Sequence, residues 1–350
     1  MNLFKPQLSF ESHPFKWWHI PLLLILVIGT IFVFVQNNHN TNEWKTCEGN
    51  IFGTIYHITY NSSVDYSDSI IQELGEVDNS LSTFNKKSTI SLINDNKTDK
   101  MDSLMLNVVN TAQIIYNETG GAFDITVAPL VNIWGFGFKK SDVADSLKID
   151  SILEFVGMDK IQVIDSRIKK TDSRLMFDCS AIAKGFGVDM VSNLFIRNGV
   201  KDFMVEIGGE VRTAGTNRSR QAWRIGINEP IDVSSTINQN IQNVIELSDM
   251  SIATSGNYRN FYIKDGKKYA HTIDPKTGFP IQHTLLSSTV IAKDCMTADA
   301  YATAFMVLGL EKSKKILNNH KELKAYFIYS KDDGSNGVWH SSGLLLEEQY

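Results

Sequence analysis

The residues best suited to chemistry lie in the segment TADAYATAFMVLG, residues 297–309. Asp299 and Thr303 are four residues apart, so a helix would place this carboxylate and this hydroxyl on one face. Oxygen ligands of this kind suit Mg²⁺, which usually keeps several waters and shares the phosphate oxygens of a substrate. On its own the local sequence favours a simpler interpretation, because Asp299 in a first turn behind an N-cap Thr297 would merely complement the helix dipole.

A second candidate segment is FDCSAIAKGFGVD, residues 177–189, which has the composition of a turn that leads into a helix. Backbone N–H groups at a helix start attract phosphate, and Lys184 would add a positive charge there. The segment matches neither GxxxxGK[ST] nor GxGxxG, so the common nucleotide motifs are absent. A glycine-bearing helix start with a solvated lysine explains the segment equally well.

The third segment is TGGAFDITVAPLVNIWGFG, residues 119–137. Gly120 and Gly121 permit a tight turn and a close approach of a ligand to the backbone, and Asp124 follows directly. The apolar and aromatic residues after it would suit the wall of a site for a ring-shaped ligand. The alternative is a helix C-cap, a surface carboxylate and ordinary core packing.

Two further features are weak when taken alone. The segment EIGGEVRTAG, residues 206–215, places Gly208-Gly209 between two expected strands, where a plain turn explains them. His271 lies at the end of an expected strand, just before the turn at Asp274-Pro275. Its unperturbed pKa near 6.5 suits a general base, although a lone histidine is often structural.

The elements that must position these residues follow from apolar periodicity and turn residues. Helices are expected over residues 70–81, 104–118, 182–197 and 298–308. Strands are expected over residues 53–60, 203–207, 211–215, 223–228, 288–292 and 325–330, with a hairpin over 259–269 that turns at Asp265-Gly266. Because helices and strands mix without strict βαβ alternation, the sequence predicts an α+β fold with mixed or antiparallel sheets and packed helices.

Composition excludes several classes of protein. The chain has 350 residues, of which 43% are apolar and 21% charged, with a net charge of −5. That charge argues against a surface that tracks nucleic-acid phosphates. The three cysteines, Cys47, Cys179 and Cys295, are odd in number and widely spaced, so neither a disulfide framework nor a thiol-rich zinc site is expected.

The N-terminal part of the chain has the pattern of a membrane anchor. Residues 17–35 contain no Asp, Glu, Lys or Arg, and 19 residues of helix would span roughly 28 Å, close to the thickness of a bilayer core. Lys5 and Lys16 precede this segment, so residues 1–16 are expected in the cytoplasm and the bulk of the chain outside it. A cleaved signal peptide is the alternative, but no small-x-small site follows Val35. Residues 36–50 are expected to be a polar linker before a domain over residues 51–350.

Taken together and in this order, the segments resemble the FAD:protein FMN transferases, the ApbE-type flavin transferases. The resemblance runs from about Gly53 to about Gly309 and includes GTIYHITY, LSTFN, the three segments above, EIGGE, ATSGNYRNFY and HTIDPKTGFP. It implies an ApbE-like fold and metal-dependent transfer of FMN from FAD to a threonine or serine hydroxyl of an acceptor protein, with release of AMP. The implied acceptors are membrane redox subunits or exported flavoproteins, met on the periplasmic side of a bacterial inner membrane.

The resemblance also assigns roles to individual residues. Asp299 and Thr303 match the side-chain metal ligands, and Ala181, which could offer only its carbonyl oxygen, matches a third; Mn²⁺ accepts the same ligands as Mg²⁺. His271 matches the residue that deprotonates the acceptor hydroxyl. The positions that match FAD contacts are Phe52, Phe84, Ala122, Phe123, Asp124, Asp178, Lys184 and Ile273.

Other functions stay open at the level of sequence. Some relatives hydrolyse FAD to FMN and AMP with water in place of the protein hydroxyl, and the same metal site would serve both reactions. A non-enzymatic FAD-binding protein would need the pocket but not Asp299 and Thr303. A membrane-tethered interaction protein would leave the clusters of glycine and acidic residues unexplained.

Overall fold

The structure is a computed structural model that describes residues 17, 21, 25–28, 42–138, 145–230, 241–257, 261–264, 267–344 and 346. The chain divides into a small unit, Met1–Glu43 with Ser62–Val64, and a large unit, Trp44–Asn61 with Asp65–Tyr350. The large unit holds the site residues described below.

Within the described residues, the main sheet has eight strands. In spatial order they are β1 (Glu43–Ile51), β2 (Thr54–Ser62), β5 (Phe203–Ile207), β6 (Glu210–Ala214), β9 (Ser251–Gly256), β12 (Leu285–Ala292), β13 (Lys324–Ser330) and β14 (Asn336–His340). From β2 to β14 every neighbouring pair is antiparallel.

Three hairpins and a set of helices complete the large unit. The hairpins are β3 (Ile161–Ile164) with β4 (Arg167–Lys170), β7 (Trp223–Asn228) with β8 (Ile241–Leu247), and β10 (Phe261–Lys264) with β11 (Lys267–Ala270). The helices are α2 (Ser67–Leu81), α3 (Thr89–Asn94), α4 (Ser103–Glu118), α5 (Ala128–Ile133), α6 (Ser146–Leu153), α7 (Ala183–Arg197), α8 (Cys295–Leu308) and α9 (Leu310–Asn319), with a 3-10 turn at Met158–Lys160.

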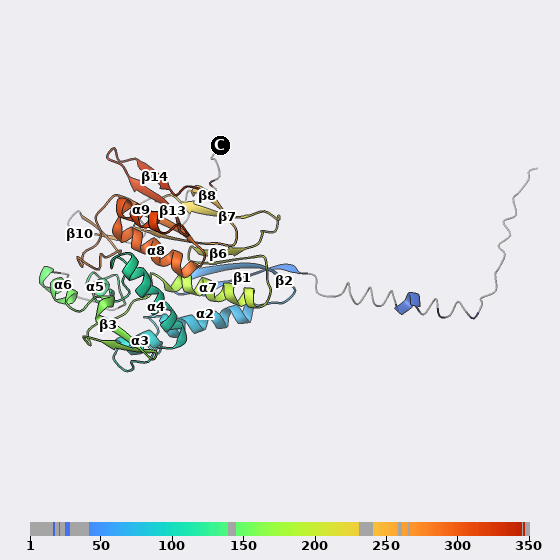
Figure 1. The fold of residues 1–350 in the computed structure, drawn as a ribbon, viewed down its shortest axis with the longest axis horizontal. Coiled ribbons are helices and arrows are strands. Elements are labelled where there is room, and N and C mark those ends of the chain that lie inside the picture. Colours follow the sequence, from blue (N-terminus) through green and yellow to red (C-terminus); the bar gives the residue numbers. More distant parts are fainter. Residues whose placement is uncertain are drawn as a thin grey trace, which may run out of the picture. The chain divides into compact units, whose positions relative to one another are not determined.

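The centre of the main sheet is buried on both faces. Along β12, Val290 and Ala292 belong to the largest core cluster, which α4 and α8 also build, whereas Ile291 belongs to a separate cluster with residues of β7 and β8. Successive side chains of a strand point to opposite faces, so α8 covers one face of β12 and the β7–β8 hairpin covers the other. α8 also packs against β9 and against α7, which lies beside it in Figure 1. This two-sided packing holds α8, which carries Asp299 and Thr303, in the interior of the unit.

The structure confirms the predicted α+β class and the expected helices and strands, with two differences. Residues 43–50, expected to end a linker, form most of β1. α8 begins at Cys295 instead of near residue 298, because Asp294 is its N-cap and accepts a hydrogen bond from Thr297 N at 2.9 Å. Thr297 is therefore not the cap, and Asp299 lies in the second turn. The turn at Asp265-Gly266 and residues 258–260 lie outside the described residues.

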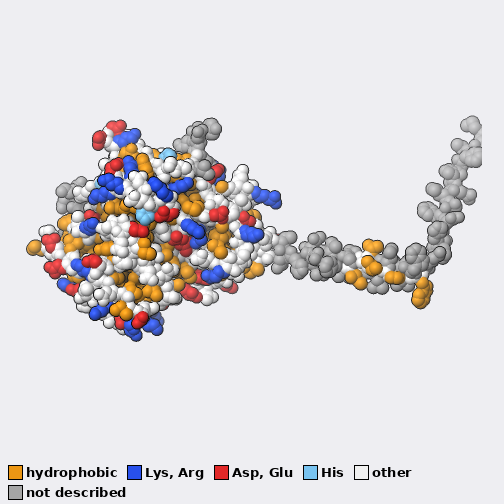
Figure 2. All heavy atoms as spheres, in the orientation of Figure 1, with side chains coloured by type: hydrophobic (Ala, Val, Ile, Leu, Met, Phe, Trp, Pro, Cys, Tyr) orange, Lys and Arg blue, Asp and Glu red, His pale blue; other side chains and the backbone are white. Residues whose placement is uncertain are grey.

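Other expectations concern the cysteines, the surface and the N-terminus. All three cysteines are buried and free of disulfides. On the face drawn in Figure 2, acidic and basic side chains are interspersed over the large unit. Most of the expected anchor at residues 17–35 and all of residues 1–16 lie outside the described part of the chain. In that described part, no helix combines the length and apolar character needed to cross a bilayer.

Candidate active site

A cavity of about 530 Å³ opens in the large unit and brings the predicted site residues together. It is lined by residues of α5, α7, α8, β6, β7 and β9 and by the turns between elements. The predicted residues in its lining are Phe84, Ala122, Phe123, Asp124, Asp178, Ala181, Lys184, His271, Ile273, Asp299 and Thr303. Residues spread over more than half of the chain therefore share one site.

Part of this lining carries buried charges; we call Lys184, Glu210 and Asp299 the charged lining. Glu210 is only 1% exposed, and its Oε2 lies 2.5 Å from Lys184 Nζ. Burial raises the pKa of Glu210 to about 7, and the attraction of Lys184 opposes that shift. Burial likewise raises the pKa of Asp299, again opposed by Lys184. With both carboxylates ionised, the cluster has one more negative than positive charge, which favours a cation in the cavity.

The charged lining depends on a very close approach of α7 to α8. Asp299 Oδ2 accepts a hydrogen bond from Gly185 N at 3.0 Å. A Cβ atom added at Gly185 would lie 2.3 Å from Cys295 O and 2.8 Å from Asp299 Cβ. Only glycine fits at this position, because neither the α8 backbone nor the helix start can move aside cheaply.

The residues around Asp299 fit a divalent cation. Asp299 Oδ1 forms no hydrogen bond with any described residue, although the carboxylate is buried at the cavity wall. Thr303 lies four residues further along α8 and lines the same cavity, and Ala181 lies in the turn that precedes α7. Among the described residues, no three His, Cys, Asp or Glu side chains gather into a metal cluster. A cation held here would complete its coordination with backbone, water or substrate oxygens.

The predicted tight turn at Gly120-Gly121 is present, with φ values of +59° and +84°. Asp124 behind it is buried and not a surface carboxylate, and its Oδ1 accepts hydrogen bonds from Thr126 N at 2.7 Å and Thr126 Oγ1 at 2.6 Å. Burial raises the pKa of Asp124 to about 6. Asp178 N donates to Ile125 O at 2.8 Å, so this turn and the turn before α7 are joined beside the cavity.

A different part of the lining is apolar; we call Val131, Phe136 and Ile273 the apolar lining. The loop that carries Phe136 is tied down by Trp134, whose Nε1 donates to Gly278 O at 2.7 Å. The ring of His271 lies edge-on to Phe136, with 6.4 Å between ring centroids. Phe84 is 79% exposed and adds an aromatic ring to the lining. These side chains offer a surface that a flat ring system would cover.

One predicted residue lies elsewhere, and one functional candidate was not predicted. Phe52 lies in the β1–β2 turn, outside the cavity lining, and its ring approaches Gly187 so closely that a Cβ there would be 2.7 Å from Phe52 Cε2. Glu210 was missed, although it directly follows Gly208-Gly209 at the first position of a strand. The sequence did contain a signal for it: an acidic residue directly after a glycine pair, at a strand position whose side chain points inward.

Comparisons with known proteins find relatives over most of the chain. The model of the ApbE family matches residues 52–327. The FAD:protein FMN transferase of Vibrio cholerae is 37% identical over 297 residues, which cover 82% of this chain and 87% of that protein. The FAD:protein FMN transferase of Escherichia coli K12 is 33% identical over 316 residues, which cover 86% of this chain and 88% of that protein.

Solved structures are similar to this chain over the same region. The flavin transferase ApbE from Vibrio cholerae superposes with a TM-score of 0.77 at 34% identity, covering 86% of this chain and 98% of that one. The apo form of the Pseudomonas stutzeri flavinyl transferase ApbE superposes with a TM-score of 0.76 at 29% identity, over 86% of this chain and 95% of that one. Sequence and fold agree with these proteins over most of the chain, which therefore belongs to the ApbE family.

Proposed function

We propose that the chain is an FAD:protein FMN transferase that acts in this cavity. The observation that carries the proposal is the union of charged and apolar linings in one cavity of about 530 Å³. FAD joins a flat apolar ring system to a diphosphate, so it needs both kinds of surface within one site. The names of the relatives at 33% and 37% identity support the same reaction.

The reaction exchanges the phosphoanhydride bond of FAD for a phosphate ester bond to the acceptor. The hydroxyl oxygen of an acceptor threonine or serine attacks the phosphorus on the FMN side of the diphosphate. The bond from that phosphorus to the bridging oxygen breaks, AMP leaves with the bridging oxygen, and the acceptor hydroxyl loses its proton. No oxidant or reductant is required, so the protein must position the two reactants and balance charge.

His271 is the residue that we assign to the hydroxyl proton. It lines the cavity and lies beside Phe136 in the apolar lining. A histidine can accept a proton near neutral pH, which makes it a suitable general base.

The diphosphate end of FAD belongs to the charged lining. Asp299, Thr303 and the carbonyl oxygen of Ala181 would hold Mg²⁺ or Mn²⁺, and such an ion neutralises charge on a diphosphate and aligns its oxygens. Lys184 supplies a further positive charge, and Glu210 holds its ammonium group within the cavity wall at 2.5 Å. Asp124 and Asp178, on two joined turns, would contact polar parts of FAD.

The proposal includes a membrane location. Residues 17–35 form an uncleaved anchor, with residues 1–16 in the cytoplasm and the catalytic domain in the periplasm. The apolar composition of this segment and the lysines before it support the anchor. Tethering would bring the enzyme to membrane redox subunits or exported flavoproteins at a high effective concentration.

The test uses the protein from residue 42 onward with FAD, Mg²⁺ and a flavin-free redox subunit encoded in the same genome. We expect the acceptor to gain the mass of one FMN residue and in-gel flavin fluorescence, and we expect chelation of the metal to abolish both. Free FMN and AMP with no labelled acceptor, for several candidate acceptors, would instead establish an FAD hydrolase. Bound FAD without either product would show a flavin-binding protein.

A further inference from the structure

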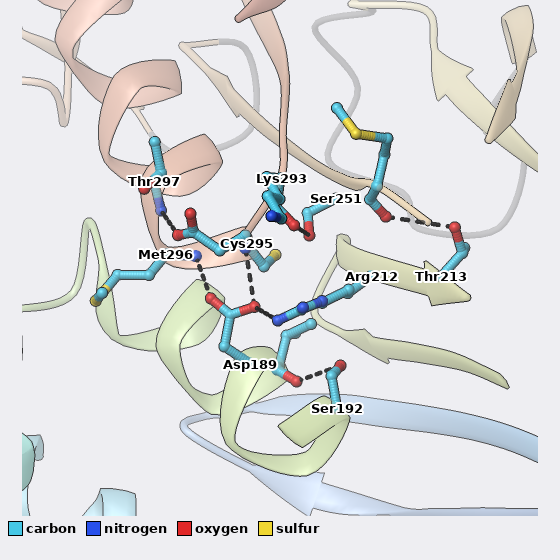
Figure 3. Close-up of polar contacts among 12 residues, drawn as sticks. Asp189, Ser192, Arg212, Thr213, Ser251, Lys293, Cys295, Met296 and Thr297 are labelled. Atoms are coloured by element: carbon cyan, nitrogen blue, oxygen red, sulfur yellow. Dashed lines mark hydrogen bonds and ion pairs between the residues drawn. The ribbon is translucent and has the colours of Figure 1, made fainter. Parts of the chain in front are cut away.

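Asp189 on α7 is buried, at 5% exposure, and its carboxylate points at the first turn of α8 (Figure 3). Its Oδ1 accepts a hydrogen bond from Cys295 N at 3.0 Å, and its Oδ2 accepts one from Met296 N at 2.8 Å. Oδ1 also pairs with Arg212 Nη1 of β6 at 2.7 Å. Asp189 lies outside the cavity lining, so it does not reach a substrate there.

The contact solves a local problem of α8. The first N–H groups of a helix have no partner within the helix and must be satisfied from outside. The N-cap Asp294 accepts a hydrogen bond from Thr297 N, and Asp189 takes the N–H groups of Cys295 and Met296. Two carboxylates therefore cap one helix start, and Arg212 compensates the buried charge of Asp189.

Asp189 also provides one of two points at which hydrogen bonds of the described residues join α7 to α8. Four residues earlier on α7, Gly185 N donates to Asp299 Oδ2, and Asp299 lies four residues after Cys295 on α8. The two points are thus one helical turn apart on both helices. Two such points fix how far α8 can slide along α7, whereas the bond at Gly185 alone would leave the start of α8 free to shift.

From this geometry we propose that Asp189 is a positioning residue for the metal-ligating face of α8. By fixing the first turn of α8 to α7, it sets where Asp299 and Thr303 stand relative to Ala181, which lies just before α7. The inference rests on the proposed metal site, and it concerns how this chain builds that site. Removing the contact loosens the ligand set without removing a ligand.

The test measures Mn²⁺ binding by electron paramagnetic resonance on the purified protein from residue 42 onward, without FAD or acceptor. We expect Asp189→Asn to weaken Mn²⁺ binding roughly tenfold. The carboxylate offers one oxygen to each N–H group, whereas the amide has a single acceptor oxygen and an NH₂ group that cannot accept. In transfer assays the Mg²⁺ needed for half-maximal rate should rise by the same factor. The rate at saturating Mg²⁺ and the KM for FAD should stay within about threefold of the parent protein.

The matched control is Asp294→Asn, which removes one negative charge from the same helix start but leaves a side chain that caps equally well. It should bind Mn²⁺ like the parent protein. Asp189→Asn leaves the charge of Arg212 without its partner carboxylate, which could itself weaken Mn²⁺ binding. The double variant Asp189→Asn with Arg212→Gln removes that charge, and it should still bind Mn²⁺ about tenfold more weakly than the parent protein. If Asp189→Asn does not fold, Asp189→Glu keeps the charge and the longer side chain displaces the start of α8, with the same expected loss.

Asp299→Ala separates the two claims. If it abolishes Mn²⁺ binding while Asp189→Asn and Asp189→Glu bind like Asp294→Asn, the positioning role is wrong and the metal site stands. Mn²⁺ binding that survives Asp299→Ala unchanged would overturn the metal site and the positioning role together. Recovery of full affinity in the double variant would assign the effect to Arg212 and contradict the role of Asp189.

Discussion

The charged lining and the apolar lining of the cavity are built in different ways. Lys184, Glu210 and Asp299 stand on α7, β6 and α8, which are regular elements that pack directly on each other. Val131 is on the short helix α5, while Phe136 and Ile273 are in connecting segments. The charges are thus held by regular elements, and the apolar surfaces by a short helix and connecting segments.

The difference follows from what each part must do. Charges act on a diphosphate through distance and direction, so small displacements are costly, and buried charges must also be paired. An apolar ring is recognised by covered area, which tolerates small shifts. We therefore expect substitutions around the charged lining to have the larger and more abrupt effects, and the predictions below test that order.

The largest effect is expected from Gly185→Ala. The added Cβ would lie 2.3 Å from Cys295 O, so α7 and α8 must separate and Asp299 loses its N–H donor. We expect transfer to fall more than 100-fold and the free energy of unfolding to drop by about 2 kcal/mol or more. Urea unfolding and the transfer assay measure both quantities.

Gly75→Ala is the matched control for that substitution. Gly75 lies within α2, and an added Cβ meets nothing within 4 Å. Alanine should raise the free energy of unfolding by about 0.5–1 kcal/mol and leave transfer unchanged. If both glycine variants behaved alike, the close approach of α7 to α8 would not be what sustains the charged lining.

His271→Gln tests the chemistry beside the apolar lining. The glutamine fills a similar volume but cannot act as a base, so we expect the transfer rate to fall by about 10². FAD affinity, measured by flavin fluorescence, should stay within about threefold. A variant that transfers FMN at the parent rate would remove His271 from the proposed mechanism.

Phe136→Ala should have a smaller effect, confined to binding. Removing the ring uncovers apolar surface beside the flavin, so we expect FAD affinity to weaken about tenfold, or ~1.4 kcal/mol. The control is Phe279→Ala, a ring that packs against Trp134 outside the cavity lining. Equal losses in both variants would mean that the loop, and not contact with FAD, is affected.

The smallest effect concerns the protonation of Asp124. Its pKa is raised by burial from 3.8 to about 6, so between these pH values the folded protein holds a proton that the unfolded chain releases. The free energy of unfolding should therefore fall as pH rises to about 6 and then level off. Between pH 5 and pH 7 the loss is about 1 kcal/mol.

Asp124→Asn removes this titration. Urea unfolding without FAD or metal, at pH 5 and pH 7, should show the parent protein losing about 1 kcal/mol relative to the variant. A parent protein that instead gained stability relative to Asp124→Asn over this range would show that the hydrogen bonds from Thr126 outweigh burial.

The sequence predicted those features that leave a local pattern. The apolar faces of α2, α4, α7 and α8 recur at helical spacing, and the order of the family segments located almost the whole cavity lining. β1 was missed because most of its side chains are not buried, so an apolar alternation is lacking. The start of α8 was predicted too late because Asp294 and Thr297 are both residue types that cap helices well. Only the fold shows that Cys295 and Met296 belong to the helix.

Long-range pairing is what the sequence did not reveal. Glu210 meets Lys184 across 26 positions of the chain, and Asp189 meets Cys295 across 106. Neither pair has a local spacing that sets it apart from ordinary surface charge. Phe52 is the opposite case. The family resemblance predicted it as an FAD contact, but in the fold it packs on Gly187 outside the cavity lining.

The most direct test of the central claim is the stoichiometry of the reaction. The protein from residue 42 onward is mixed with FAD, Mg²⁺ and an excess of acceptor, and AMP and flavin-labelled acceptor are counted in the same samples. Transfer in this cavity predicts one AMP for each labelled acceptor at every time point, with both lost in Asp299→Ala. AMP that accumulates without labelled acceptor, at a rate independent of acceptor concentration, would contradict it.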